Sequence, residues 1–309
     1  MAQCFWNNHR GQEESSCYLP WDGPYAGYAM GGKNAVYTND EIDGIEFASE
    51  TAINPTAALA VGRYAPAGAN SATRGYAFGG YDGSWLTEVD GMEFATGAAV
   101  NPAAVLSVAR SGAAGVNSAT KGYAMGGGAP TVNVIDGIEF SGETAINPAA
   151  TLSVARTGPA GVNSTTRGYA MGGNVTPYTT EIDGIEFAGE TAINPAAVLA
   201  VARLFPGGVN STTRGYALGG FTGSYTAEVD GIEFAGETAI NPAAVLSVAR
   251  SGGIGVNSTT RGYAMGGFTG AYWDYIDGVE FAGETAISTS AVLSLARYAG
   301  AGVQSGGTL

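Results

Sequence analysis

Residues 261–267 read "RGYAMGG", and close copies of this heptapeptide occur at five other places in the chain. The copies are "AGYAMGG" at 26, "RGYAFGG" at 74, "KGYAMGG" at 121, "RGYAMGG" at 167 and "RGYALGG" at 214. Their first glycines lie at 27, 75, 122, 168, 215 and 262, so the spacing is 46 to 48 residues. A period of this length with a double glycine is typical of β-propeller blades of four strands each. The heptapeptide therefore predicts one repetitive domain.

Each repeat reads as four short strands, which we call A to D. From Arg203, "RLFPGGVNS" is followed by the turn "TT", "RGYALGG", a loop, "EVDGIEFA", the link "GETAINP" and "AAVLSVAR". Alternating polarity, with Gly, Asn, Pro and Thr at each break, favours strands over helices. Strand A consists mainly of Gly, Ala and Val, which suits the innermost position, where large side chains have no room. The double glycine lets strand B end in a turn that residues with a Cβ disfavour.

The two ends of the chain indicate how the ring closes. The copy at residue 26 is a strand B with no strand A before it, and residues 297–305 are a strand A with no strand B after it. The C-terminus therefore supplies the inner strand of the first blade, which leaves no open edge to aggregate. The sequence predicts an all-β fold, a closed six-bladed β-propeller of four-stranded antiparallel blades over residues 25–309, with an N-terminal arm over residues 1–24.

The repeats resemble two groups of known proteins. "LSVARSG" leading into a small-residue strand, then "GYAMGG" and "EVDGIEF", resembles the Kelch repeat, with its arginine after strand D, its double glycine and its acidic, aromatic strand C. The chain departs from that repeat in having "NPAA", and no tryptophan, where strand D begins. Over residues 25–309 the arrays are similar to those of virion-associated, tail-fibre-like proteins of cyanobacterial and marine tailed phages. This resemblance implies a role in a phage particle.

Charge and composition narrow the class of protein. The formal net charge of −14 argues against a nucleic-acid partner, whose phosphates are held by Lys and Arg. No apolar run approaches the ~20 residues of a membrane span, and the N-terminus has neither the basic nor the apolar region of a secretion signal. We therefore expect no nucleic acid, no membrane insertion and, given the resemblance, synthesis in the host cytoplasm followed by a place in the virion.

Variation between the repeats is confined to two loops. The interval from Asp43 to Gly75 is 32 residues and stays the same in the following repeats, so all length variation falls between strands B and C. The junction from strand D to the next strand A also varies in sequence. Because successive strands alternate in direction, these two sets of loops lie on one face of the disc, and the nearly identical A–B and C–D loops lie on the other.

The variable loops are rich in aromatic residues, which form common binding surfaces when a rigid frame presents them. The alternative is that these aromatics pack between the blades. The candidate binding residues for a receptor are Tyr64, Tyr81, Trp85, Phe205, Phe221, Tyr225, Phe268, Tyr272, Trp273 and Tyr298, and the same loops also contain Tyr37, Tyr178 and Tyr275.

Residues for catalysis or metal binding are scarce. The one histidine, His9, lies in the N-terminal arm, which excludes an imidazole metal site or a serine–histidine triad on the ring. The aspartates of strand C, from Asp43 to Asp277, lie away from the axis, and six equal copies do not suit a single catalytic site. We interpret them as turn and hydrogen-bonding residues, with weak Ca²⁺ binding as the alternative. The sequence predicts no enzyme, no cofactor and no metal site.

The N-terminal arm has no counterpart in the repeats and is too aromatic for a free tail. It is either a plug of its own propeller or an anchor on another subunit, and the phage resemblance favours the anchor. Its main contacts would be Phe5, Trp6 and Trp21. The only cysteines, Cys4 and Cys17, either form a disulfide or remain thiols.

The sequence and its resemblance together predict a non-enzymatic structural and binding protein of a phage virion, of tail-fibre or adhesin type. Its arm would bind other virion proteins in a larger assembly, and its variable face would bind a host-surface glycan or protein. One alternative is a capsid or neck decoration protein, in which both faces serve packing. Another is a bacterial carbohydrate-binding propeller or lectin.

Overall fold

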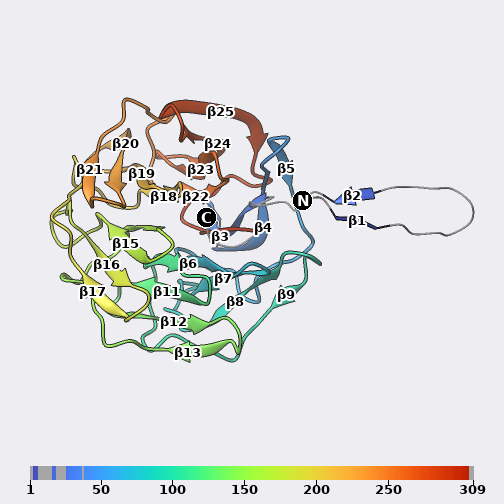
Figure 1. Cartoon of the computed structure of the whole chain (residues 1–309), viewed down its shortest axis with the longest axis horizontal. Coiled ribbons are helices and arrows are strands. Elements are labelled where there is room, and N and C mark those ends of the chain that lie inside the picture. Colours follow the sequence, from blue (N-terminus) through green and yellow to red (C-terminus); the bar gives the residue numbers. More distant parts are fainter. Residues whose placement is uncertain (1–2, 6–15, 19–25, 37, 306–309) are drawn as a thin grey trace, which may run out of the picture.

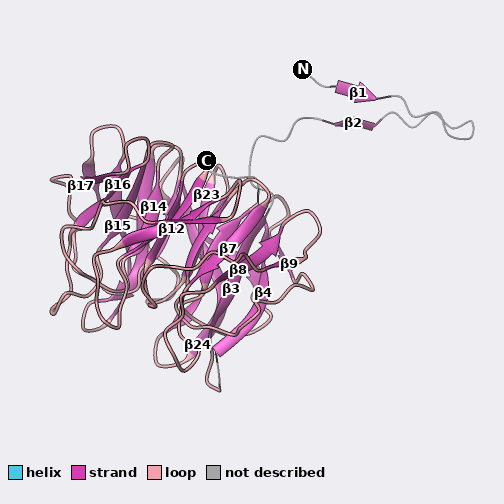
Figure 2. Ribbon diagram, turned by 90° about the horizontal axis from the view of Figure 1, so that it is seen from below, coloured by secondary structure: helices cyan, strands magenta, loops and turns pink. Residues whose placement is uncertain are grey.

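The computed structural model describes residues 3–5, 16–18, 26–36 and 38–305. Its strands form six four-stranded antiparallel sheets and one two-stranded hairpin. Figure 1 shows the six sheets as blades around a central axis, and Figure 2 shows the ring from the side as a disc. The predicted six-bladed β-propeller is confirmed. No helix among the described residues is long and apolar enough to cross a membrane.

The blades follow one another in chain order, and the first strand named in each is the one nearest the axis. Blade 1 consists of β26 (Ala301–Gln304), β3 (Ala26–Lys33), β4 (Thr38–Glu46) and β5 (Thr51–Ile53). Blade 2 consists of β6 (Ala67–Asn70), β7 (Arg74–Phe78), β8 (Val89–Glu93) and β9 (Ala99–Val100). Blade 3 consists of β10 (Ala114–Asn117), β11 (Lys121–Met125), β12 (Ile135–Glu139) and β13 (Thr144–Ile146).

The second half of the ring repeats this arrangement. Blade 4 consists of β14 (Ala160–Asn163), β15 (Arg167–Met171), β16 (Ile182–Glu186) and β17 (Thr191–Ile193). Blade 5 consists of β18 (Gly207–Asn210), β19 (Arg214–Phe221), β20 (Tyr225–Glu233) and β21 (Thr238–Ile240). Blade 6 consists of β22 (Ile254–Asn257), β23 (Arg261–Phe268), β24 (Tyr272–Glu280) and β25 (Thr285–Val292).

Blade 1 takes its innermost strand from the C-terminal region, as predicted. In blade 2 a serine holds the covalent turn between the two inner strands, because the Ser71 N–H donates to the Arg74 carbonyl at 2.9 Å and the Ser71 Oγ accepts from the Arg74 N–H at 3.0 Å. Ser305 makes the same two hydrogen bonds to Ala26, at 3.0 and 3.1 Å, although no turn joins them. The closing strand therefore docks through the bonds that a covalent turn makes in the other blades.

The outermost strands begin earlier than predicted. In blade 5, β21 lies inside the segment expected to be a link, and the expected strand "AAVLSVAR" makes only an isolated bridge through Val245. Pro242 follows β21. A proline cannot donate a hydrogen bond to the strand ladder, so the regular strand ends before it. Blade 6 has Thr289 at this position, and there β25 continues as one longer strand.

The hydrophobic core lies between neighbouring blades. One cluster joins Val116 and Tyr123 of blade 3 to Ile185 of blade 4. In the same junction the ring of Tyr123 stacks on Phe187 of blade 4, with centroids 5.6 Å apart. Since each blade buries its faces against both neighbours, the repeats stabilise one another as a closed ring.

The N-terminal hairpin consists of β1 (Gln3–Phe5) and β2 (Ser16–Tyr18), which pair antiparallel with Cys4 opposite Cys17. Directly opposed residues of an antiparallel pair have Cα atoms about 4.5–5.5 Å apart, which is within the range that a disulfide spans. The side chains of this hairpin, and the whole of Trp6 and Trp21, lie outside the described part of the structure. The disulfide and the anchor role of Phe5, Trp6 and Trp21 stay predictions.

Candidate functional site

The loops that vary between repeats meet on one face of the disc, which we call the variable face. Each junction after strand D pairs with the B–C loop of the next blade. For example, Tyr64 bridges Tyr81, and Leu204 bridges Phe221. The predicted grouping of the two variable loops is confirmed.

A ring of six residues with left-handed backbone surrounds the axis at this face, and we call it the axial ring. Its members are the second residues after the D-strand arginines: Ala65, Gly112, Gly158, Phe205, Gly252 and Ala299, with φ between 51° and 67°. The N–H of each member donates to the carbonyl oxygen of the member before it in the ring, at 2.7–2.8 Å, and Ala65 donates to Ala299. Because these bonds close into a circle, the opening at the axis has a fixed size.

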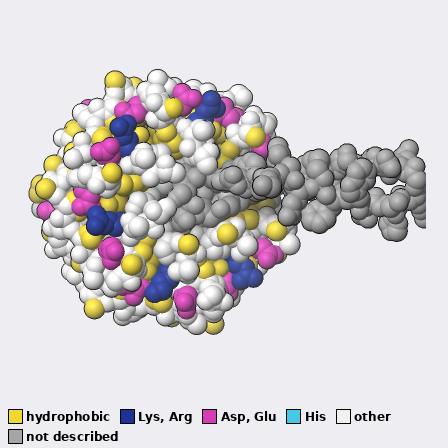
Figure 3. Space-filling model, in the orientation of Figure 1, with side chains coloured by type: hydrophobic (Ala, Val, Ile, Leu, Met, Phe, Trp, Pro, Cys, Tyr) yellow, Lys and Arg dark blue, Asp and Glu magenta, His cyan; other side chains and the backbone are white. Residues whose placement is uncertain are grey.

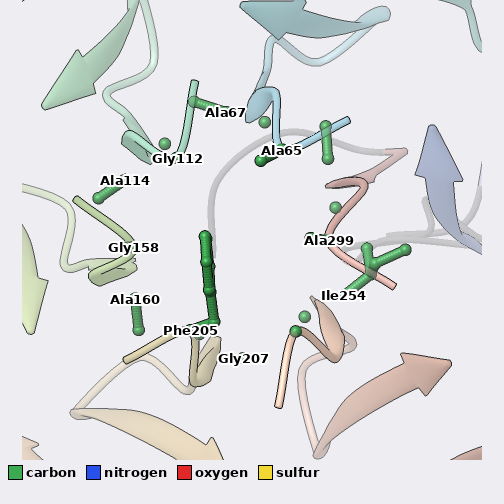
Figure 4. Close-up of a pocket in the computed structure, with 18 of the residues that line it drawn as sticks. Ala65, Ala67, Gly112, Ala114, Gly158, Ala160, Phe205, Gly207, Ile254 and Ala299 are labelled. Carbon is green, nitrogen blue, oxygen red and sulfur yellow. The ribbon is translucent and has the colours of Figure 1, made fainter. Parts of the chain in front are cut away.

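The axial ring leads into a cavity of about 110 Å³ whose walls are the small residues of the inner strands. Phe205 and Ile254 are the largest side chains that line it, and Figure 4 shows the ring of Phe205 extending into it. The inner strands are in close contact, since a Cβ on Gly302 would lie 1.9 Å from the carbonyl oxygen of Gly255. The inner strands therefore consist of small residues because larger side chains would clash with the neighbouring strand.

Phe205 is the one bulky member of the axial ring, and its φ of 51° is unfavourable for a large side chain. Its five counterparts are glycine or alanine. A residue held in this conformation costs about 1–3 kcal/mol, and such strain concentrates at functional sites. The ring of Phe205 lies near Gly158, where an added Cβ would be 3.1 Å from it, and 6.4 Å from the ring of Tyr64. Phe205 therefore marks this face as a candidate site.

Eight aromatic rings on the variable face form a continuous series, which we call the aromatic arc. Its members in order are Tyr178, Phe221, Tyr225, Phe268, Tyr272, Tyr298, Tyr64 and Phe205, with neighbouring centroids 5.1–6.4 Å apart. These are distances at which aromatic rings attract one another. All eight side chains are half-buried, so the rings support one another and still present surface to solvent. Burial, followed by the neighbouring hydroxyl of Tyr298, raises the pKa of Tyr64.

Three of the predicted binding residues lie outside the aromatic arc. Tyr81 and Trp85 pack on each other in blade 2, with centroids 5.4 Å apart, and 48% of the Trp85 surface is exposed. Trp273 packs on Tyr275 in blade 6 at 4.9 Å and is half-buried. The other seven predicted residues belong to the arc, together with Tyr178. Tyr37 lies outside the described residues.

The repeated aspartates are hydrogen-bonding residues, as interpreted, but they lie within the third strand of each blade and not in turns. Each pairs in the interior with the arginine that ends the preceding strand D: Arg63–Asp90, Arg110–Asp136, Arg156–Asp183, Arg203–Asp230, Arg250–Asp277 and Arg297–Asp43. Arg110 also donates to the carbonyl oxygens of Gly126 at 2.7 Å and Ala124 at 3.0 Å. The pairs connect consecutive blades. Within the described ranges, no group of three or more His, Cys, Asp or Glu side chains is placed to hold a metal ion.

Because these ion pairs are buried, the stability that each contributes depends on the presence of both partners. Burial raises the pKa of Asp90 and lowers that of Arg63, and the opposite charge of the partner counteracts each shift. The side chains of both residues are at most 1% exposed. A buried charge without its partner is strongly unfavourable. The pairs are therefore structural.

The opposite face carries ion pairs that are repeated from blade to blade. Lys121 Nζ lies 2.8 Å from Glu190 Oε1, and the Tyr123 hydroxyl donates to the same oxygen at 3.0 Å. The bond from Lys121 lowers the pKa of Glu190. Five junctions have this arrangement, whereas Ala26 and Gly97 replace both charges between blades 1 and 2. Figure 3 shows basic side chains spaced around a face of the disc, each beside acidic ones.

The two faces therefore differ in chemistry. One carries the repeated ion pairs, and the other carries the aromatic arc next to the axial cavity. Sequence reasoning missed the axial ring, although a single Phe among Gly and Ala at the second residue after each arginine was a signal. A scan against models of protein families and a search of curated proteins found no match to this chain.

Proposed function

We propose that this protein is a non-enzymatic binding protein of a tailed-phage virion, of tail-fibre or adhesin type, and that its aromatic arc binds a receptor on the host surface. The aromatic arc is the observation that supports this proposal most. It lies beside the axial cavity and ends at Phe205, which holds a strained backbone where three of its five counterparts are glycine. The resemblance of the repeats to tail-fibre-like proteins supports a place in the virion.

The arc favours a neutral ligand. Phe and Tyr side chains carry no charge at neutral pH, and their faces pack on apolar surface, while the Tyr hydroxyls offer hydrogen bonds. A sugar ring offers both an apolar face and hydroxyl groups. An apolar side chain of a protein offers an apolar face alone. A host-surface glycan or protein is therefore the proposed partner. A bacterial lectin would use the same arc, whereas a capsid or neck decoration protein would not need it.

Replacing Phe205 by glycine should weaken receptor binding and leave the fold intact. Truncation of an important interface aromatic costs about 2 kcal/mol or more, which is roughly a thirtyfold rise in Kd. Three counterparts of Phe205 are already glycine, so the backbone accepts the change, and relief of strain offsets lost packing. Adsorption of the purified protein to host cells and its melting temperature are the measurements.

Tyr225→Ala tests the arc at a second position, and Lys121→Gln, on the opposite face, is the control that should bind as the wild type does. Normal adsorption by both arc variants would show that the arc is not the receptor site. Absence of the protein from purified particles, measured by mass spectrometry, would contradict the virion assignment independently of the arc.

Removing residues 1–24 should give a folded, soluble ring that no longer enters particles. The propeller closes without these residues, since β3 begins at Ala26 and takes its partner from the C-terminal region. We propose that Phe5, Trp6 and Trp21 anchor the protein, because burying one large apolar side chain contributes about 1.5–3 kcal/mol. Incorporation is measured by complementation of a deletion phage. An armless chain that assembles normally, or one that cannot fold, would contradict the anchor.

A further inference from the structure

The outer edge of blade 6 differs from the outer edges of the other five blades. β25 covers eight residues, whereas the outermost strands of blades 1 to 5 cover two or three. In those blades an Asn-Pro pair follows the strand, but blade 6 has Ser288-Thr289 in its place. Proline at an edge prevents a further strand from pairing there. Blade 6 therefore lacks the feature that protects the rest of the rim.

β25 is available for pairing along its outer side. It is the last strand of its sheet, in the order β22-β23-β24-β25. The register shifts near Ile276, where the Thr289 hydroxyl donates to the Ile276 carbonyl oxygen at 2.9 Å, so the strand is irregular there but does not end. The strand "TAISTSAV" has no charged residue and no proline. Natural edge strands are usually short, charged, broken by proline or bulged. Of these features β25 has only the register shift between Ser288 and Val292.

Exposed apolar side chains lie beside this edge. Val292 is 40% exposed, and its register partner in β24, Tyr275, is 45% exposed. Tyr275 in turn packs on Trp273, with centroids 4.9 Å apart. No ring contact joins this pair to the aromatic arc among the described side chains. The equivalent valines of blades 2, 4 and 5 are also exposed, so Tyr275 is the residue that distinguishes this patch.

We propose that β25 pairs with β25 of a second copy of this chain in a two-fold symmetric dimer. An antiparallel copy brings no like charges opposite each other, because the strand is uncharged. The same patch of each subunit meets its equivalent, which is the arrangement of two-fold dimers. The pairing covers both open edges at once and places the two Tyr275–Val292 patches at the interface. An extended segment of a different protein would occupy only one edge, and the test distinguishes it.

The double variant Ser288→Asn/Thr289→Pro tests the proposal, because it gives blade 6 the sequence that five blades already contain. In sedimentation velocity the wild-type full-length chain should show a concentration-dependent dimer. The double variant should melt like the wild type and sediment as a monomer, with the dimer Kd raised about tenfold or more, since interstrand hydrogen bonds are lost. A wild type that is monomeric at every concentration overturns the proposal and points to a different partner.

Two single lysine variants test the same edge without introducing a proline. Ser290→Lys places a charge on the exposed edge and should also dissociate the dimer. Ala243→Lys makes the matched change on the proline-protected edge of blade 5 and should leave the dimer intact. If both lysine variants behave alike, or if the double variant dimerises like the wild type, β25 is not the interface. No receptor enters these measurements, so they do not depend on the aromatic arc.

Discussion

Deletion of residues 297–309 should leave a chain that does not form a stable ring. The deletion removes β26 and with it the buried Ala301 and Val303. It also removes Arg297 and leaves Asp43 in the interior without its partner. Breaking a buried ion pair costs about 3–5 kcal/mol, and burial of one Val contributes about 1.5–3 kcal/mol. The sum is comparable to the whole stability of a typical domain, about 5–15 kcal/mol.

Soluble yield and the thermal transition by circular dichroism measure this effect. The structure offers a rescue, a permuted chain in which residues 297–305 stand before Ala26 and are joined to it by two residues, as Ser71 is joined to Arg74. This chain has the covalent turn of the other blades and should melt as a closed ring. A deletion variant that melts within a few degrees of the full-length chain would show that β26 does not close the ring.

Replacement of Arg110 by methionine should destabilise the ring by about 3–5 kcal/mol, because Asp136 would then be a buried charge without its partner. The Gly126 and Ala124 carbonyl oxygens would lose their side-chain donor as well. We expect the melting temperature to fall by roughly 10 °C. Both side chains are buried between blades 2 and 3 and neither belongs to the aromatic arc, so we expect the loss to appear first as a loss of folding stability.

The double variant Arg110→Met/Asp136→Leu is the control for this interpretation. Apolar replacement of both partners removes the unpaired charge, so part of the stability should return, and the difference measures the coupling of the two side chains. If Arg110→Met alone melts like the wild type, then Asp136 is not held as a buried charge and the ion pairs do not hold the blades together.

The sequence by itself determined the ring, its closure and its two unlike faces. These follow from features that act locally or between adjacent repeats. The double glycines take positive φ, as at Gly219 and Gly220. The small residues of strand A fit where inner strands touch, and the constant spacing from Asp43 to Gly75 restricts variation to one face. The outermost strands were displaced in our prediction because pairing with strand C begins at Thr238 and not at the more apolar segment after Pro242.

Only the tertiary structure decided which residues of different blades come together. The repeat showed six arginines and six aspartates, but only the packing of consecutive blades brings Arg110 next to Asp136. The same packing brings Phe268 of blade 6 next to Tyr298, and Tyr298 next to Tyr64, and so joins separate loops into the aromatic arc. The left-handed φ of Phe205 depends on hydrogen bonds around the whole axis. Such contacts are non-local, so no single repeat encodes them.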